Sequence, residues 1–228
     1  MSIMSSEEKK RKQRQRSMAV FINAAIEIIN EEGLSCLSIR KTADRAGYNS
    51  ATLYHYFSDF DELCTFAAIK FLDEYARDLQ HYLQQTDRPL YKYVKVWECF
   101  CYHSFTHPDI FWLLFFKQMH TDYPLSHYFQ TYYDIFPEDW NEELQGYKTM
   151  LTSDNLYERE YIALTKSLRK EGTLLPEETL HAINEMNILI YRGMLETLRT
   201  NPGFISAEEA TARTVTYLQK TLTAYGIH

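Results

Sequence analysis

The segment from Ser38 to Phe57 holds side chains that could bind a nucleic acid. Their hydroxyl, amide, guanidinium and imidazole groups hydrogen-bond to phosphate oxygens and to the edges of bases. The candidate residues are Ser38, Arg40, Asn49, Ser50, Ala51, Thr52, Tyr54 and His55. Leu53 and Phe57 lie four residues apart, so they share a helix face that can pack against neighbouring helices. The polar side chains would then face outward, which suits the DNA major groove.

Three predicted helices would position these side chains. Apolar residues from Met18 to Ile29 recur at helical spacing and predict the first helix, which Gly33 ends. A short helix is expected from Ser38, its N-cap, to Ala46, and Gly47 closes it. A second short helix, capped by Asn49 or Ser50, is expected to end near Tyr56. Two short helices around a glycine-containing turn are typical of a helix-turn-helix.

The segment from Arg16 to Leu63 resembles the TetR family of bacterial repressors. The resemblance covers about the first quarter of the chain, and the run from Thr52 to Phe57 is quite specific. It implies a DNA-binding helix-turn-helix, followed by an all-α domain that has no shared motif. In the family, the position of Tyr54 commonly contacts a phosphate, and Arg40 lies where a base or backbone contact is often made. The matching runs are Ala24-Ala25-Ile26-Glu27, Glu32-Gly33-Leu34, Ser38-Ile39-Arg40-Lys41-Thr42-Ala43-Asp44-Arg45-Ala46-Gly47, Ala51-Thr52-Leu53-Tyr54-His55-Tyr56-Phe57 and Glu62-Leu63.

Three positions depart from the pattern of the family. Many relatives have lysine where this chain has Ser50 and Phe60, and a branched apolar residue where it has Thr42. The absence of the two lysines removes charge that binds phosphate, so sequence-independent affinity for DNA should be weaker.

The basic residues are gathered at one end of an acidic chain. The net charge is -7, yet residues 1–56 carry nine Lys and Arg against six Asp and Glu. A basic end on an acidic body suits a protein that touches DNA at one end only. We expect residues 1–16 to form a flexible basic arm, and we hypothesise that it reaches toward the minor groove. Its basic residues are Lys9, Lys10, Arg11, Lys12, Arg14 and Arg16.

The rest of the chain is predicted to be helical. Only 7 Gly and 6 Pro interrupt 228 residues, and neither strand alternation nor an internal repeat is visible. The expected helices span residues 59–85, 89–106, 108–120, 155–170, 176–200 and 206–225, with one helix and a loop around Pro137 between 122 and 154. We therefore predict an all-α fold of about nine helices. Its expected parts are the arm, residues 1–16, a helix-turn-helix domain, residues 17–60, and a helical ligand-binding and dimerisation domain, residues 61–228.

Residues 91–136 are unusually rich in aromatic side chains, with 16 of the chain's 34. An apolar cavity with a few polar groups is the usual form of a small-molecule site, and tyrosine supplies the hydroxyls. We predict that a small apolar or aromatic ligand binds there and releases DNA. The alternative is that these rings simply fill the core. The candidate ligand-binding residues are Trp97, Phe100, Cys101, Phe105, Trp112, Phe116, Tyr128 and Tyr132.

Cys99, His103 and His107 are spaced four residues apart on one predicted helix, as two ligands of one metal can be. Zinc normally takes three or four protein ligands, and no fourth is evident. We therefore predict a buried thiol beside surface histidines and no cofactor. The alternative is a metal or haem site.

The last two predicted helices carry continuous apolar faces. The resemblance implies that they pair with their copies in a homodimer, and a two-fold protein matches a palindromic operator. Packing within one subunit is the alternative for either face alone. The candidate dimerisation residues are Ile183, Asn187, Ile190, Met194, Thr214, Val215 and Leu218.

Several function classes lack support in the sequence. No phosphate-binding glycine loop and no hydrolase or zinc-protease motif is present, so an all-α enzyme is a rival without positive support. The longest apolar run, Ile110 to Phe116, is too short to cross a bilayer, and the first residues are too polar for a signal peptide. We expect a cytoplasmic, ligand-responsive DNA-binding regulator, most simply a repressor. A further alternative is a protein of the same fold that a partner protein controls.

Overall fold

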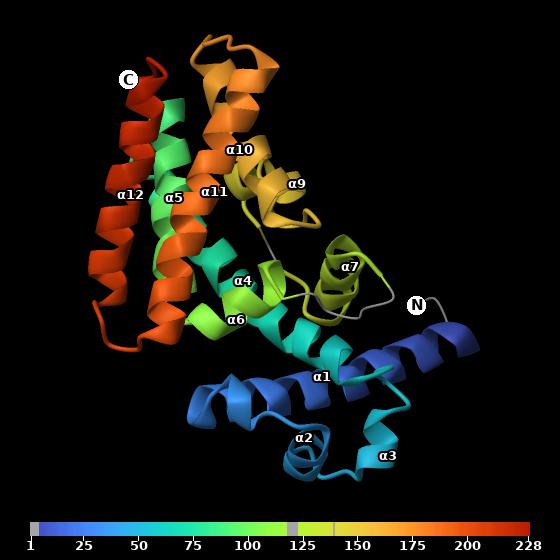
Figure 1. The fold of residues 1–228 in the computed structure, drawn as a ribbon. Helices are drawn as coiled ribbons and strands as arrows, with labels where there is room; N and C mark the ends of the chain where they lie inside the picture. Colours follow the sequence, from blue (N-terminus) through green and yellow to red (C-terminus); the bar gives the residue numbers. More distant parts are fainter. Residues whose placement is uncertain (1–4, 118–122, 139) are drawn as a thin grey trace. The chain divides into compact units, whose positions relative to one another are not determined.

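The computed structural model describes residues 5–117, 123–138 and 140–228. These residues form twelve α-helices and one 3₁₀ helix and contain no strand, which confirms the all-α fold. Nine of the helices have at least seven residues. The chain divides into two compact units (Figure 1). Of the described residues, the first unit holds 5–70 and 123–138, and the second holds 71–117 and 140–228.

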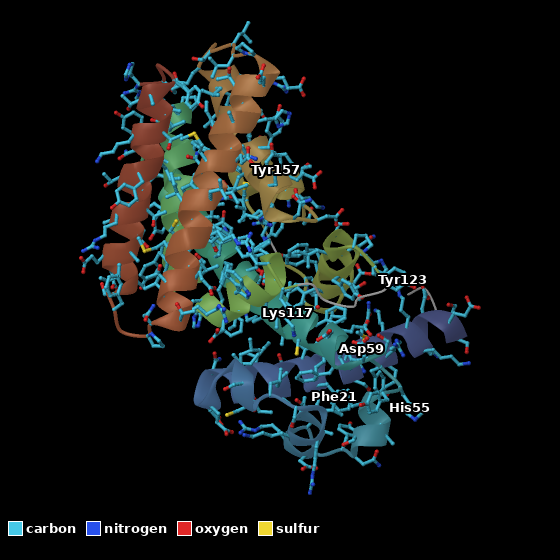
Figure 2. All side chains as sticks on the ribbon, in the orientation of Figure 1. Phe21, His55, Asp59, Lys117, Tyr123 and Tyr157 are labelled. Atoms are coloured by element: carbon cyan, nitrogen blue, oxygen red, sulfur yellow. The ribbon has the colours of Figure 1, made fainter. Side chains whose placement is uncertain are left out.

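The first unit is built on α1 (Ser6–Glu32), η1 (Leu34–Cys36), α2 (Ile39–Arg45), α3 (Ser50–Leu53), the start of α4 (Phe60–Leu83) and α7 (Leu125–Ile135). Its core is aromatic. The buried ring of Phe21 on α1, labelled in Figure 2, lies 5.2 Å from Tyr48, 5.7 Å from Tyr56 and 6.2 Å from Phe57. Aromatic pairs at these distances stabilise beyond the area they bury, so Phe21 fixes both short helices against α1.

The prediction of a flexible arm is wrong for residues 6–16, which form the first turns of α1. Ser5 caps the helix: its Oγ accepts from the Glu8 amide at 3.1 Å, and the Glu8 carboxylate accepts from the Ser5 amide at 2.8 Å. Lysine, arginine and glutamine, which dominate the segment, are good helix formers. Residues 1–4 of the predicted arm lie outside the described residues.

The second unit continues α4 and adds α5 (Pro89–Thr106), α6 (Pro108–Phe115), α8 (Glu142–Gln145), α9 (Lys148–Leu151), α10 (Leu156–Lys170), α11 (Glu177–Thr200) and α12 (Ala207–Ala224). Helices α5, α11 and α12 lie side by side, with α10 against α5 and α11 (Figure 1). The bounds of α5 match the prediction, and those of α10, α11 and α12 differ by one residue or less at each end.

Two predicted boundaries differ from the structure, and two short helices were not predicted. Helix α6 ends at Phe115 and not near His120, and residues 118–120 lie outside the described residues. The four-residue helices α8 and α9 were not predicted, because one helical turn has too few residues to show a period. The predicted domain boundary at residue 60 also differs, because the continuous helix α4 contributes residues to both units.

No helix in the described residues combines the length and the hydropathy that a bilayer crossing requires.

Candidate functional site

Each of the two short helices in the first unit begins at a side-chain cap. The Ser38 hydroxyl accepts from the Lys41 amide at 3.2 Å, and the Asn49 carboxamide oxygen accepts from the Thr52 amide at 2.8 Å. Between them Gly47 adopts φ +78°, a left-handed conformation that side chains disfavour. Both caps and the turn agree with the prediction. The chain therefore fixes the angle at which α3 leaves α2.

Helix α3 has an apolar inner face and a polar outer face. Leu53 and Phe57 are buried, as is Ala43 on α2, as predicted for the side that packs inward. Tyr54 is 55% exposed, and the side chain of Arg40 is 90% exposed. All eight predicted DNA-binding residues are at least partly exposed: Ser38, Arg40, Asn49, Ala51, Tyr54 and His55 fully, and Ser50 and Thr52 in part. Hydrogen-bonding groups are thus presented on a rigid element, which is the form of a base-reading surface.

Arg14, which sequence analysis had placed in a free arm, is bonded to the end of this element. Its Nη1 donates to the carbonyl oxygen of His55 at 2.7 Å, and its Nη2 donates to that of Tyr56 at 2.8 Å. The guanidinium carbon also lies 5.5 Å from the centre of the Tyr56 ring. These groups border a polar pocket of about 330 Å³ that Tyr54 and Ser58 also line. Figure 2 labels His55 at this position.

The other cations near the helix-turn-helix are divided between ion pairs and solvent. Arg45 lies 2.7 Å from Glu31 and 3.7 Å from Glu27, and hydrogen bonding to Glu31 raises its pKa. Lys41 pairs with Glu32. These pairs tie α2 to the end of α1. Arg40 lies 3.8 Å from Asp44 on its own helix, yet its side chain is 90% exposed.

Thr42, where the family has a branched apolar residue, is fully buried in α2. Its hydroxyl has no hydrogen-bond partner within the described residues. A buried hydroxyl without a partner is destabilising, so this departure carries a cost in stability.

The core of the second unit brings three of the predicted ligand-binding rings together around Tyr191. Trp97 lies 5.7 Å from Tyr191, Phe100 lies 5.1 Å from it, and Phe105 stacks on it at 5.7 Å. All four side chains are at most 4% exposed. Sequence analysis missed Tyr191, because it follows the segment where the aromatic residues are concentrated. Burial raises the pKa of Cys101 beside this cluster.

A fourth predicted ring, Phe116, lies 6.3 Å from Tyr191 at the margin of this cluster, and the remaining predicted ligand-binding rings lie outside it. Trp112 and Phe116 are partly exposed, and the Arg192 guanidinium lies 5.4 and 5.1 Å from their ring centres. Tyr128 and Tyr132 belong to α7 in the first unit, where Tyr128 packs on Phe66 at 5.4 Å. Two surface pockets of about 310 and 390 Å³ between α5 and α12 are lined by none of these residues.

Two adjacent ionisable residues of α10 lie in the core of the second unit. Arg159 and Glu160 on α10 are each 1% exposed. Arg159 donates to the Leu151 carbonyl oxygen at 2.5 Å and lies over the Phe115 ring. Burial raises the pKa of Glu160 to about 8, although Arg159 opposes this shift. Sequence analysis overlooked Glu160, yet a signal was present: it stands four residues after Leu156 and four before Leu164, on the apolar face of its helix.

The structure does not assemble the metal candidates. The Cys99 thiol is buried and faces the Tyr75 carbonyl oxygen at 3.8 Å, while His103 Nε2 lies 2.9 Å from Asp78. His107 ends α5 and packs on Phe71 at 4.8 Å. Within the described ranges, no group of three such side chains could hold a metal ion. Shared helix spacing placed the three residues near one another, but each has a different neighbour.

Most of the predicted dimerisation residues lie inside the subunit, which corrects that prediction. Ile183, Asn187, Thr214 and Leu218 are at most 3% exposed within one chain. Ile190, Met194 and Val215 are partly exposed. The faces identified from the sequence are mainly those that α11 and α12 bury in their own bundle, because periodicity cannot tell a core face from an interface face.

Comparisons with known proteins agree with this geometry. Residues 21–64 match the family model described as bacterial regulatory proteins, tetR family. No curated protein matches the chain. Among solved structures, the Thermus thermophilus FadR repressor in complex with lauroyl-CoA is similar at TM-score 0.57 and 13% identity, covering 90% of this chain and 94% of that one.

Two further structures share the fold. Bacillus subtilis FadR in complex with stearoyl-CoA has TM-score 0.54 and 14% identity, covering 88% of this chain and 96% of that one. RolR in complex with resorcinol has TM-score 0.51 and 14% identity, covering 91% and 89%. The helix-turn-helix over residues 21–64 is thus similar to that of the bacterial regulatory proteins of the tetR family, and the chain shares the fold of these solved structures.

Proposed function

We propose that this chain acts as a dimeric repressor that binds a palindromic operator and leaves it when a small molecule binds the second unit. The observation that carries the proposal is the helix-turn-helix with its rigidly capped α3, whose outer face presents Tyr54, His55 and Thr52. A surface of this kind reads bases in the major groove, and phosphate contacts set its register.

The dimer is supported by an exposed apolar face on α11. Leu189 is 60% exposed and Met186 is 42% exposed. At Gly193, one turn after Leu189, an added Cβ would have no described atom within 4 Å beyond the adjacent residues and the backbone of its own helix. Glycine in a helix costs about 1 kcal/mol relative to alanine, and a closely approaching helix of a second copy gives a reason for it. We therefore propose that Met186, Leu189 and Gly193 lie at the dimer interface, with Ile190 and Met194 at its edge.

Helix α4 is the proposed route from ligand to DNA. In the first unit Phe66 on α4 packs on Phe57 at 5.9 Å, directly after α3. In the second unit Tyr75 on the same helix packs on Phe100 at 5.4 Å. A ligand that repacks the rings around Tyr75 would move α4 and with it the DNA-reading helix. A coupling of about 2 to 3 kcal/mol would weaken operator binding roughly 30- to 150-fold.

The ligand is proposed to bind among Trp97, Phe100, Phe105 and Cys101, with Trp112 and Phe116 at the margin. The solved complexes with lauroyl-CoA, stearoyl-CoA and resorcinol support a small-molecule effector for this fold. One observation favours the alternative of control by a partner protein: the rings around Tyr191 are packed against one another. A compound screen that follows tryptophan fluorescence and operator release together separates the two. An effector should quench the tryptophan fluorescence and release the operator over the same concentration range. If a partner protein controls the chain, no compound should change either signal.

Operator selection tests the DNA-binding proposal. Genomic fragments bound by the wild type should contain an enriched inverted repeat, with half-sites about 34 Å apart or slightly more. Tyr54→Ala and Arg40→Ala should each weaken binding to that repeat, and affinity should fall steeply as salt rises. Tyr91→Ala, which removes a 46% exposed tyrosine from the second unit, is the matched control and should bind like the wild type. Selection that returns no inverted repeat would refute the proposal.

A further inference from the structure

The core of the second unit contains several polar atoms without a partner. The hydroxyls of Tyr75 and Tyr191, Oε2 of Glu160 and Oδ1 of Asn187 have no hydrogen bond within the described residues. All four side chains are at most 1% exposed. Leaving one such group unpaired costs about 1 to 3 kcal/mol, and most buried polar groups in proteins do have a partner. Four of them in one core indicate a polar partner that the described residues do not supply.

These groups form one cluster. Phe100 packs on Tyr75 at 5.4 Å and on Tyr191 at 5.1 Å, so it joins the two tyrosines. Burial is the main cause of the raised pKa values of both tyrosine hydroxyls, and the nearby charge of Glu160 raises them further. Asn187 lies one turn before Tyr191 and donates through Nδ2 to the Tyr93 hydroxyl at 3.0 Å, which occupies its amide but not its oxygen.

The nearest hydroxyl in the chain does not satisfy the cluster. Ser104 lies close to Tyr191 and lowers the pKa of that hydroxyl. Its own hydroxyl, however, donates to the carbonyl oxygen of Cys101 at 3.1 Å. The Ser104 hydroxyl proton is therefore already used. The ring hydroxyl of Tyr191 has no hydrogen bond within the described residues, and neither does the indole N–H of Trp97 in the same cluster.

We propose that this cluster binds the hydroxyl of a neutral aromatic alcohol, a phenol or naphthol, whose ring packs on Phe100 and Tyr191. The inference rests on the proposed ligand-responsive function and names the chemical class of its effector. A hydroxyl both donates and accepts, so one group can serve Glu160 and a tyrosine together. An aromatic ring meets the edges and faces that Phe100, Trp97 and Tyr191 present.

The electrostatics of the core select a neutral ligand. Burial is the main cause of the raised pKa values of Glu160, Tyr75, Tyr191 and Cys101. Burial thus disfavours negative charge at each place, although the buried Arg159 opposes the shifts of Glu160, Tyr75 and Tyr191. An anionic head group would meet the same penalty, whereas a phenol stays protonated at neutral pH. This separates the proposed effector from carboxylates and from acyl-CoA thioesters, whose phosphates are charged.

Entry of the ligand must part the rings, which lie 5.1 to 6.1 Å apart around Phe100 and Trp97. Tyr75 is the member of the cluster that belongs to α4. Binding that moves Tyr75 therefore acts on the helix that both units share, so recognition of the hydroxyl and release of DNA have one structural origin.

Matched probes test the proposal on the full chain bound to its operator. Phenol and 2-naphthol carry the hydroxyl, toluene and naphthalene lack it, and benzoate and 2-naphthoate carry a negative charge. Quenching of tryptophan fluorescence reports binding, and fluorescence anisotropy of a labelled operator reports release. At least one alcohol should bind the protein and cause it to release the operator. The matching apolar compound should bind roughly ten-fold more weakly than the alcohol, and the matching carboxylate more weakly still.

Two single-atom variants then locate the hydroxyl. Glu160→Gln and Tyr75→Phe should each weaken binding of the alcohol by roughly three- to ten-fold and leave binding of the apolar counterpart unchanged. Glu158→Gln, at an exposed position on the same helix, is the matched control. It should change neither the binding of the alcohol nor that of the apolar counterpart. Tyr75→Phe removes one hydroxyl without adding volume, so it keeps the test valid if Glu160→Gln does not fold.

The outcomes distinguish this inference from the proposed function. If the wild type binds its operator and neither alcohol binds, or if the apolar or anionic probe binds as tightly as the alcohol, the inference is overturned and the regulator stands. Equal loss of alcohol and apolar binding in both variants also overturns it, because the hydroxyl is then not what they contact. A wild type without an operator overturns the proposed function itself.

Discussion

Arg14 and His55 are separated by 41 residues, and the guanidinium Nη1 of the first donates to the carbonyl oxygen of the second at 2.7 Å. The carbonyls of His55 and Tyr56 lie two and three residues past Leu53, in the turn that follows α3. Arg14 thus ties the turn after α3 to the basic first turns of α1. A positive group near the C-terminal end of a helix also interacts favourably with the helix dipole.

We predict that Arg14 acts by positioning α3. Arg14→Ala should lower operator affinity about ten-fold while leaving the slope of log affinity against log salt unchanged. Arg14→Lys should restore only part of the affinity, because a lysine cannot bridge two carbonyls in the planar fork of an arginine. The measurement is operator binding by anisotropy over a series of salt concentrations.

Arg11→Ala is the comparison for this prediction, since Arg11 is an exposed cation one turn earlier on α1. If Arg11 binds phosphate, its loss lowers the salt slope by about one. A similar fall in slope for Arg14→Ala would show that Arg14 is a phosphate ligand and contradict the positioning role.

The dimer interface is predicted to run along the outer face of α11. Leu189→Glu places a charge on a side chain that is 60% exposed in the subunit, so the subunit should fold normally. The charge would be buried between two copies, which is costly unless it is paired. Light scattering should therefore give the mass of one chain, 27.1 kDa, for the variant and twice that mass for the wild type. Leu174→Glu, at an 87% exposed leucine before α11, is the control and should remain dimeric. If Leu189→Glu is also dimeric, the interface does not lie on this face of α11.

The sequence predicted local features better than partnerships between distant segments. Ser38, Asn49 and Gly47 could be identified because caps and left-handed turns depend on a few neighbouring residues. The role of Arg14 could not, because its acceptors are backbone atoms 41 and 42 residues away that no side-chain pattern marks. The predicted arm failed for a different reason: charge was taken as a sign of disorder, although a capping box and good helix formers favoured a helix.

The same limit applies to the second unit. Periodicity found the buried faces of α11 and α12, but Ile183 and Leu218 proved to pack inside one subunit. The aromatic residues of α5 were identified as a cluster, whereas Tyr191 joins it from α11 through tertiary packing alone. Glu160 was detectable in principle from its place between Leu156 and Leu164, and it was missed because glutamate is usually a surface residue.

Thr42 offers a test of a buried hydroxyl in the first unit. Thr42→Val keeps the shape of the side chain and removes a hydroxyl that has no partner within the described residues. We expect the free energy of unfolding to rise by about 1 kcal/mol, with operator binding unchanged. Thr65→Val is the matched control, because the buried Thr65 hydroxyl donates to the Asp61 carbonyl oxygen at 2.8 Å. Loss of the Thr65 hydroxyl should not raise the free energy of unfolding. If thermal unfolding shows equal effects for the two variants, the prediction for Thr42 is wrong.

The buried carboxyl of Glu160 should make stability depend on pH. Its pKa is about 8 in the folded chain, against an ordinary value of 4.5. Below pH 4.5 the carboxyl is protonated in both the folded and the unfolded chain, so its ionisation has no effect on stability. Between pH 4.5 and 8 the unfolded chain releases the proton and the folded chain keeps it, so rising pH favours unfolding.

Glu160→Gln removes this dependence while keeping the shape of the side chain. The wild type should lose stability relative to the variant from pH 4.5 up to about pH 8, by at most about 5 kcal/mol, and the difference should level off above that. Thermal unfolding of both proteins across this range gives the difference directly, and titrations common to the two proteins cancel in it. Glu158→Gln, which changes an exposed carboxyl on the same helix, should follow the wild type at every pH. A difference between wild type and Glu160→Gln that stays constant with pH would mean that Glu160 ionises in the folded core with its ordinary pKa, which would contradict the prediction.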